Sequence, residues 1–196
     1  MTPLTAAFRE SLGSAAVREG LADGVFTRLP SPIGRLLIVS GPEGICRISF
    51  EEEAEDVTLA EVALRLGPRI VASDAELAST RDALSGYLEG HEGDLREVPV
   101  DLRLVASPFR RTVLETLRRE VGPGRTTAYG ALAASAGHPR AARAVGTAMA
   151  RNPVPIVVPC HRVLPGSGGL GNYGGGPARK RALLELEGSL ASPLSP

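Results

Sequence analysis

The sequence places a cysteine directly before a histidine, Cys160-His161, after a short apolar run at 156–158 that looks like a strand. Because the thiolate is the nucleophilic form of cysteine, a reactive cysteine needs a base or a positive field close by. His161 could act as that base through a water molecule, and a carboxylate of the last helix, Glu185 or Glu187, could hold its tautomer. Taken alone, the pair favours a buried, inert cysteine beside a structural histidine, because Cys–His signatures do not transfer between protein families.

The segment 140–149 is a second candidate functional segment, because its sequence predicts a helix that carries arginines and otherwise almost only small side chains. Arg140 and Arg143 are three residues apart and would be neighbours on the helix surface. The small residues of the segment are Ala141, Ala142, Ala144, Gly146 and Ala148. Such a helix could lie close against a narrow groove or a backbone, although this composition alone is more typical of a tightly packed core helix.

Charge is divided unevenly along the chain. Residues 1–105 carry a net charge of −8 and residues 106–196 a net charge of +8, so the whole chain is neutral. Lys180 is the single lysine, and arginine suits phosphate and base-edge contacts better than lysine does. The asymmetry indicates either a nucleic-acid-binding second half or a basic surface that is merely solvated.

Length and composition narrow the class of protein. A chain of 196 residues, 43% hydrophobic and 22% charged, fits one large or two small globular domains. We expect no membrane span and no secretory signal, and hence a cytoplasmic protein with no membrane partner, whose Cys46 and Cys160 are reduced. His91, His138 and His161 are scattered without zinc-site spacing, so we expect no metal and no cofactor.

The first half predicts a small α/β domain over residues 1–105. The expected strands cover 24–29, 34–40, 44–50, 69–72 and 98–102, and the expected helices cover 55–66 and 74–88. The turn Gly41-Pro42-Glu43 predicts a hairpin, and residues 1–23 are expected to be frayed or to form a short surface helix. Cys46 falls in a strand pattern and is expected to be a buried hydrophobic residue. No catalytic constellation occurs in this half.

The second half, residues 106–196, predicts a mainly helical domain. The expected helices begin at Pro108 with Ser107 as N-cap, run from a cap at Thr126 or Thr127 through about 136, cover 140–149, and cover 177–187 after the glycine-rich loop 166–176. The second and third of these helices, joined by Gly137-His138-Pro139, have the outline of a helix-turn-helix.

Several short motifs of the second half together carry a resemblance to a known family. They are Ser107-Pro-Phe-Arg110, Thr127-Ala-Tyr-Gly130, Ala141-Ala-Arg-Ala-Val-Gly146, Asn152-Pro-Val-Pro155, Pro159-Cys-His-Arg-Val163, Gly171-Asn-Tyr-Gly174 and Leu183-Leu-Glu-Leu-Glu-Gly188. In order and approximate spacing they resemble the O6-alkylguanine-DNA alkyltransferases, strongly over about 105–190 and more loosely before that. The resemblance implies a ribonuclease-H-like first domain and a second domain with a helix-turn-helix.

The resemblance also implies a chemical role for five residues. Cys160 would accept the alkyl group, His161 would deprotonate it through a water molecule, and Glu187 would orient His161. Asn152 would position the Cys–His segment. Tyr129 would press on a backbone phosphate and donate a proton toward guanine N3.

Other implied roles concern DNA and the extruded base. Arg143 would replace the flipped-out nucleotide in the stack, with its helix in the minor groove. The implied DNA contacts are Thr127, Arg140, Ala141, Ala142, Arg143 and Gly146. The implied base pocket is formed by Pro155, Val163, Gly171, Tyr173 and Gly174.

The implied function is DNA repair by direct damage reversal. A monomer would transfer an alkyl group from O6-alkylguanine, and from O4-alkylthymine, in double-stranded DNA to Cys160, irreversibly and once. The preferred alkyl size and cooperative binding along DNA stay open. Leu114 stands where family members usually carry Trp, which concerns core packing. Gly174 stands where some carry Ser, so one hydrogen bond to the base is missing or comes from a backbone N–H.

Two other functions would use the same residues. A lesion-binding module would share the DNA-binding architecture without needing the thiol of Cys160. A thiol hydrolase would use Cys160 and His161 but leave the basic half unused. A zinc base deaminase is excluded, because the sequence has no Cys-x-x-Cys.

Overall fold

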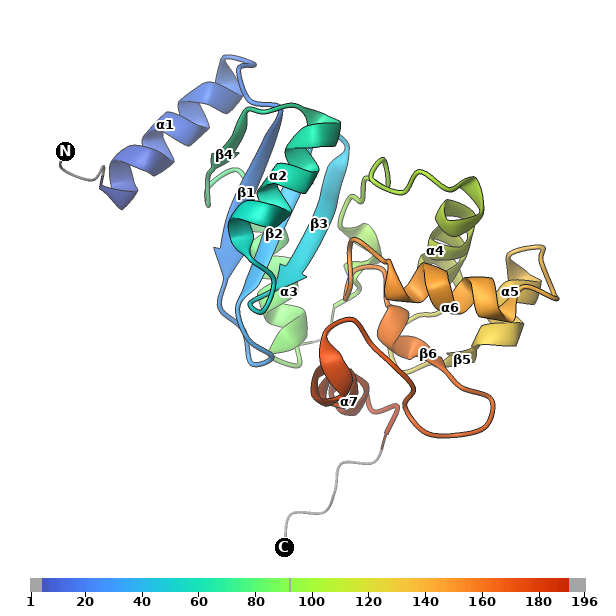
Figure 1. The fold of residues 1–196 in the computed structure, drawn as a ribbon. Coiled ribbons are helices and arrows are strands. Elements are labelled where there is room, and N and C mark those ends of the chain that lie inside the picture. Colours follow the sequence, from blue (N-terminus) through green and yellow to red (C-terminus); the bar gives the residue numbers. More distant parts are fainter. Residues whose placement is uncertain (1–4, 92, 191–196) are drawn as a thin grey trace, which may run out of the picture.

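The computed structural model describes residues 5–91 and 93–190 and shows a sheet with helices followed by a cluster of helices (Figure 1). The strands of the sheet are β1 (Gly24–Leu29), β2 (Leu36–Gly41), β3 (Gly44–Phe50) and β4 (Ile70–Ala72). Their order is β3-β2-β1-β4, with β4 parallel to β1 and the other pairs antiparallel. The hairpin predicted around Gly41-Pro42-Glu43 is confirmed. Gly44 closes it with a φ of 127°, a conformation that favours glycine.

We call the described residues up to 105 the first part of the chain and those from 106 the second part. Side chains that alternate along the strands divide the core of the first part into two layers. Leu37 and Val39 of β2 pack with Val62 of α2 (Glu55–Leu66). Leu36 and Ile38 point to the opposite face, where α3 (Ala78–Leu88) and the second part of the chain lie. Cys46 belongs to the first layer, and burial raises the pKa of its thiol to about 12. It is therefore the inert buried residue that the strand pattern predicts.

Two further helical segments belong to the first part. They are α1 (Ala6–Arg18) and the short 3-10 helix η1 (Leu95–Glu97). Figure 1 shows α1 beside β4, at the edge of the sheet. Of the two alternatives for residues 1–23, the surface helix is therefore the one that forms, and residues 1–4 lie outside the described part.

The second part is mainly helical, as expected. Its elements are α4 (Pro108–Glu120), β5 (Thr127–Ala128), α5 (Tyr129–Ser135), α6 (Ala142–Ala150), the 3-10 helix η2 (Cys160–Arg162), β6 (Val163–Leu164) and α7 (Gly176–Leu186). The hydroxyl of Ser107 accepts the N–H of Arg110 and caps α4, as predicted. Leu114 is fully buried in a core that is continuous with the α3 face of the sheet, so the position is one of core packing.

Two predictions for the first part are wrong. Residues 98–102 form no strand, because only Val100 pairs, in a single bridge to Ile45. Pro99 contributes no N–H donor to a ladder, which limits pairing there. The helix expected from 74 begins at Ala78, and before it the Glu10 carboxylate accepts the N–H groups of Asp74 and Ala75, at 2.9 Å each.

Three predictions for the second part are also wrong. Neither Thr126 nor Thr127 caps α5, because Thr127 lies in β5 and the N-cap is Ala128, which has no side-chain acceptor. Helix α6 begins only at Ala142, so Arg140 precedes it and is not a helical neighbour of Arg143. The run 156–158 is a turn rather than a strand, with Ile156 at a φ of 75°.

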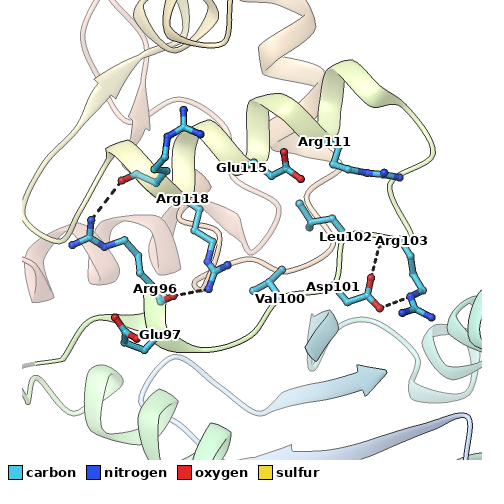
Figure 2. A pocket seen from close by; sticks show the side chains of 10 residues that line it. Arg96, Glu97, Val100, Asp101, Leu102, Arg103, Arg111, Glu115 and Arg118 are labelled. Atoms are coloured by element: carbon cyan, nitrogen blue, oxygen red, sulfur yellow. Dashed lines mark hydrogen bonds and ion pairs between the residues drawn. The ribbon is translucent and has the colours of Figure 1, made fainter. Parts of the chain in front are cut away.

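A cavity of about 940 Å³ lies between the two parts. Figure 2 shows the segment 96–103 on one side and α4 on the other. Arg118 reaches from α4 to donate hydrogen bonds to the carbonyl oxygens of Arg96 and Val98. The bonds fasten the end of the first part to α4, and Cys160 does not line this cavity.

Within the described residues, no helix combines the length and apolar character needed to cross a membrane.

Candidate active site

Cys160 is the first residue of η2 and is held by the side chain of Asn152. The amide Nδ2 of Asn152 donates to the sulfur of Cys160 at 3.1 Å and to the carbonyl oxygen of Val158 at 2.8 Å. Its Oδ1 accepts the N–H of Val154 at 3.1 Å. One amide thus ties the turn around Ile156 at both ends and points a donor at the sulfur.

Burial dominates the acidity of this thiol. Cys160 is only 5% exposed, and burial raises its pKa to about 11, against the opposing effects of the Asn152 hydrogen bond and the Lys180 charge. The residue is therefore a neutral thiol at neutral pH, and a reaction through its thiolate needs a base.

His161 follows Cys160 and lies in a fully buried environment. Its Nε2 is 3.0 Å from Oε1 of Glu187. Burial lowers the pKa of His161, although Glu187 opposes the effect. An ionised carboxylate only accepts hydrogen bonds, so the neutral ring carries its proton on Nε2. Its Nδ1 is buried with no hydrogen-bond partner in the described part of the chain, so it is the ring nitrogen with a free lone pair.

Glu187 is the carboxylate at this histidine. It ion-pairs with Arg162, whose Nη2 lies 2.6 Å from Oε1. Burial alone would raise the pKa of Glu187, but the hydrogen bonds from His161 and Arg162 prevail and lower it to about 2. Glu185, the alternative left open by the sequence, lies 3.6 Å from Arg181 on the same helix. The structure thus brings Glu187, and not Glu185, to His161.

Two cavities meet at Cys160. One, of about 510 Å³, is lined by Tyr129, Gly146, Met149, Ala150, Cys160, Pro165, Gly171, Asn172, Tyr173 and Gly174. The other, of about 550 Å³, shares Met149, Ala150, Cys160, Tyr173 and Gly174 with the first, and its further lining residues include Asn152 and Pro155. Four of the five residues expected in the base pocket therefore line these cavities. Val163 is not among the lining residues and its side chain is fully buried in β6, so its part in the base pocket stays a prediction.

The residues expected to contact DNA lie on α6, in the turn before it and in β5, and one of them, Gly146, lines the first cavity together with Tyr129. Tyr129 begins α5, and burial raises the pKa of its phenol. A Cβ at Gly146 would lie 3.9 Å from the Tyr129 ring. Arg143 is exposed and precedes Gly146 by three residues, about one turn. Thr127, Ala141 and Ala142 are half-buried, and Arg140 is exposed in the turn before α6.

Three polar residues of the site were missed by the sequence analysis: Arg162, Lys180 and Tyr87. Lys180 is fully buried, and its Nζ donates to the carbonyl oxygen of Val163 at 2.8 Å. Burial lowers the pKa of Lys180, yet its charge still favours the thiolate of Cys160. The sequence marks Lys180 as the single lysine of the chain but does not indicate what it does. Within the described residues, no group of three or more His, Cys, Asp or Glu side chains could hold a metal ion.

Comparison with known proteins identifies the family. A model of the ribonuclease-like domain of 6-O-methylguanine DNA methyltransferase matches residues 25–102, and a model of the DNA-binding domain of the same family matches residues 108–189. The chain belongs to the 6-O-methylguanine DNA methyltransferase family. The family resemblance stated from the motifs and the two-domain fold are thereby confirmed.

Individual relatives are similar to this chain in sequence along most of their length. The methylated-DNA–protein-cysteine methyltransferase of Haemophilus influenzae is 35% identical over 164 residues, which cover 83% of this chain and 85% of the relative. The human methylated-DNA–protein-cysteine methyltransferase is 37% identical over 166 residues, covering 83% and 79%. This chain therefore has the activity of a methylated-DNA–protein-cysteine methyltransferase and serves DNA repair by alkyl transfer.

Solved structures of the family have the same fold. The Mycobacterium tuberculosis O6-methylguanine methyltransferase superimposes with a TM-score of 0.72 at 34% identity, covering 88% of this chain and 96% of the other. Mycobacterium tuberculosis OGT in complex with DNA gives 0.70 at 36% identity, covering 84% and 93%. The predicted DNA-binding character of this chain is supported by that complex and by the family model.

Proposed function

We propose that Cys160 takes the alkyl group from O6-alkylguanine in double-stranded DNA, once per protein molecule, and that O4-alkylthymine is a second substrate. The observation that carries the proposal is the position of Cys160, which lines a cavity of about 510 Å³ while Asn152 donates to its sulfur. Pockets of about 300–1,000 Å³ are typical of small-molecule sites. An alkylated base in this cavity would present its alkyl carbon to the sulfur.

The reaction is an in-line displacement at the alkyl carbon. The S–C bond forms as the C–O6 bond breaks, and guanine leaves with the electron pair of the broken bond. The thiol proton passes through a water molecule to the free Nδ1 of His161, whose Nε2–H is held by Glu187. The hydroxyl of Tyr129 donates a proton to guanine N3 and regains one from solvent. The product is a thioether, which cellular thiols do not reverse, so the protein acts once.

Extrusion of the base from the duplex has to precede this reaction. A guanine inside a duplex hides O6 from a side chain, and flipping a nucleotide out costs a few kcal/mol. In this proposal α5, the turn after it and α6 act as a helix-turn-helix in the minor groove, and exposed Arg143 fills the gap in the stack. Thr127, Arg140, Ala141, Ala142 and Gly146 lie along the same DNA surface. Minor-groove contacts are nearly independent of sequence, which suits a search for damage anywhere.

The remaining parts of the proposal concern organisation. The boundary between the domains falls at 105/106, in support of which the two family models end at 102 and begin at 108. The first domain is ribonuclease-H-like, supported by its four-stranded sheet with one parallel edge strand. The protein acts as a monomer on duplex DNA.

The test is a stoichiometric reaction followed by mass spectrometry. The protein is mixed with one equivalent of duplex carrying O6-methylguanine, and separately with O4-methylthymine. We expect one CH2 unit to be added at Cys160 for each lesion lost, and no addition to Cys160→Ser. A lesion that stays unmodified in a persistent complex would favour a lesion-binding module instead. Repeated turnover of an ester or peptide would favour a thiol hydrolase.

A further inference from the structure

Tyr87 connects the first domain to the carboxylate at His161. It lies on α3 and is 6% exposed, and its hydroxyl donates to Oε1 of Glu187 at 2.5 Å. The two residues are 100 positions apart in the chain. This polar contact therefore joins the sheet-bearing domain to the histidine-bearing domain at the atom that His161 uses.

The two oxygens of Glu187 are used unequally. Oε1 accepts from Tyr87, from Nε2 of His161 and from Nε and Nη2 of Arg162. Among the described residues, Oε2 accepts only from Nε of Arg162, at 3.0 Å. Arg162 is itself anchored, because its Nη1 donates to the carbonyl oxygen of Val121 at 2.6 Å. Without Tyr87, Arg162 would be free to draw the carboxylate into a symmetric two-oxygen contact and away from the imidazole.

We propose that Tyr87 is a positioning residue of the alkyl transfer: its hydroxyl fixes the Glu187 carboxylate so that Oε1 holds Nε2–H of His161 and leaves Nδ1 as the base. The inference rests on the proposed function. It also gives the first domain a part in the reaction, although no atom of Tyr87 lines either cavity at Cys160.

The surroundings of the hydroxyl favour donation to Glu187. Burial raises the pKa of Tyr87, and the charge of Glu187 adds to the effect, so the phenol stays protonated. Of the charged groups nearby, Glu187 raises the pKa of Tyr87 and Arg162 lowers it. Tyr87 in turn contributes to the raised pKa of Tyr173. A small cavity of about 260 Å³ lies next to this contact and is lined by Tyr87, His91 and Glu187, among other residues.

The experiment compares Tyr87→Phe with wild type and with Ser85→Ala. The first change removes one hydroxyl and keeps the ring in the core. The second removes a hydroxyl from the same helix whose partner is the exposed carboxylate of Glu89. For each protein, single-turnover transfer of methyl from duplex DNA is measured over a range of protein concentrations. This gives a maximal rate constant and a half-saturating concentration, and melting temperature is recorded in parallel.

We expect Tyr87→Phe to lower the maximal rate constant about tenfold, the scale of a lost hydrogen bond to a charged group, with the half-saturating concentration unchanged. Ser85→Ala should match wild type. Because Tyr87 acts through the imidazole, adding Tyr87→Phe to His161→Ala should cause no further loss. An unchanged maximal rate in Tyr87→Phe, or a further tenfold loss in the double variant, would overturn the inference. Absence of methyl transfer in the wild type would instead overturn the proposed function.

Discussion

Replacing Asn152 by alanine removes the amide that fastens the turn before Cys160. Three hydrogen bonds are lost, to the Cys160 sulfur at 3.1 Å, from Val154 N–H at 3.1 Å and to the Val158 carbonyl at 2.8 Å. Val154 and Val158 are fully buried. The Val158 carbonyl keeps the N–H of Cys160 as a donor at 2.8 Å, but the Val154 N–H is left without a partner among the described residues. One unsatisfied buried group costs about 1–3 kcal/mol.

That free-energy loss has a measurable consequence. In a chain of this size, each kcal/mol lowers the melting temperature by about 2–4 °C, so Asn152→Ala should melt about 2–12 °C below wild type. The sulfur also loses a donor that lowers its pKa. Every unit by which the pKa of Cys160 rises above about 11 removes about nine-tenths of the remaining thiolate. Alkylation of Cys160 by iodoacetamide should therefore slow at every pH below that pKa.

Two further variants separate the effects. Asn152→Asp keeps an acceptor for Val154 N–H but sets a carboxylate oxygen against the Val158 carbonyl oxygen and the sulfur, so it should melt below wild type, and its thiol should react more slowly than that of wild type or of Asn152→Ala. Thr147→Ala removes an exposed hydroxyl that donates to the Arg143 carbonyl and should change stability by less than about 0.5 kcal/mol. An Asn152→Ala protein with wild-type melting and wild-type thiol reactivity would refute the role of this amide.

Three more predictions address the acceptor, the DNA and the acid limit. Cys160→Ser should abolish methyl transfer but leave duplex affinity within about twofold by fluorescence anisotropy, since the proposed DNA contacts do not include Cys160 and contacts to phosphate and sugar make up much of such an interface; collapse of binding would make Cys160 structural. Arg143→Ala should slow single-turnover repair of duplex DNA far more than reaction with free O6-methylguanine base, and equal slowing would contradict its role in extrusion. The pKa of Glu187 is lowered from 4.5 to about 2, so its stabilisation of about 3 kcal/mol is complete above about pH 4.5 and is lost as pH falls toward 2. Urea unfolding of wild type and Glu187→Gln should converge over that window, and a constant gap would count against the buried pair.

Much of the fold follows from short-range chemistry that the sequence displays. The turn at Gly41-Pro42-Glu43 and the cap at Ser107 act within a few residues, and both form as predicted. The errors arise where tertiary contacts override local patterns. Residues 98–102 look like a strand, but Pro99 has no N–H and the segment has one bridging residue. Arg140 continues a helical spacing, but the chain is still in a turn there.

The site shows the same division between local and long-range information. Cys160, His161 and Glu187 were found because their motifs match a family in order and spacing. Tyr87 was not found, because it sits in an ordinary amphipathic helix and its partner lies 100 residues away. Arg162 likewise has no sequence signal of burial, although both members of its pair with Glu187 are at most 5% exposed. Buried polar partners of this kind are set by packing alone.

The first domain also supports Tyr173, which lines both cavities at Cys160. The ring of Phe50, at the end of β3, meets the ring of Tyr173 edge to face at 6.1 Å between centroids. A Cβ on Gly175 would lie 2.7 Å from the Phe50 ring, so only glycine permits this approach. The guanidinium of Arg179 lies over the Phe50 ring, 4.8 Å from its centroid, and donates to the carbonyl oxygens of Ile33 and Gly175. The acidic half, which lacks a DNA-binding charge, therefore contributes by holding Tyr173 in place.

Deep burial of the acceptor suits a protein that reacts once. A turnover enzyme would have to free its sulfur after each cycle, and a side chain 5% exposed would hinder that step. In the proposed reaction nothing has to leave the sulfur. With its pKa at about 11, only about one thiol in ten thousand is ionised at neutral pH, so stray electrophiles in solvent meet an unreactive group. An alkylated base held in the cavity reacts nonetheless, because it places its alkyl carbon beside the sulfur at high effective concentration while His161 takes the proton. The burial that suppresses the free thiol thus makes its reaction selective for the lesion.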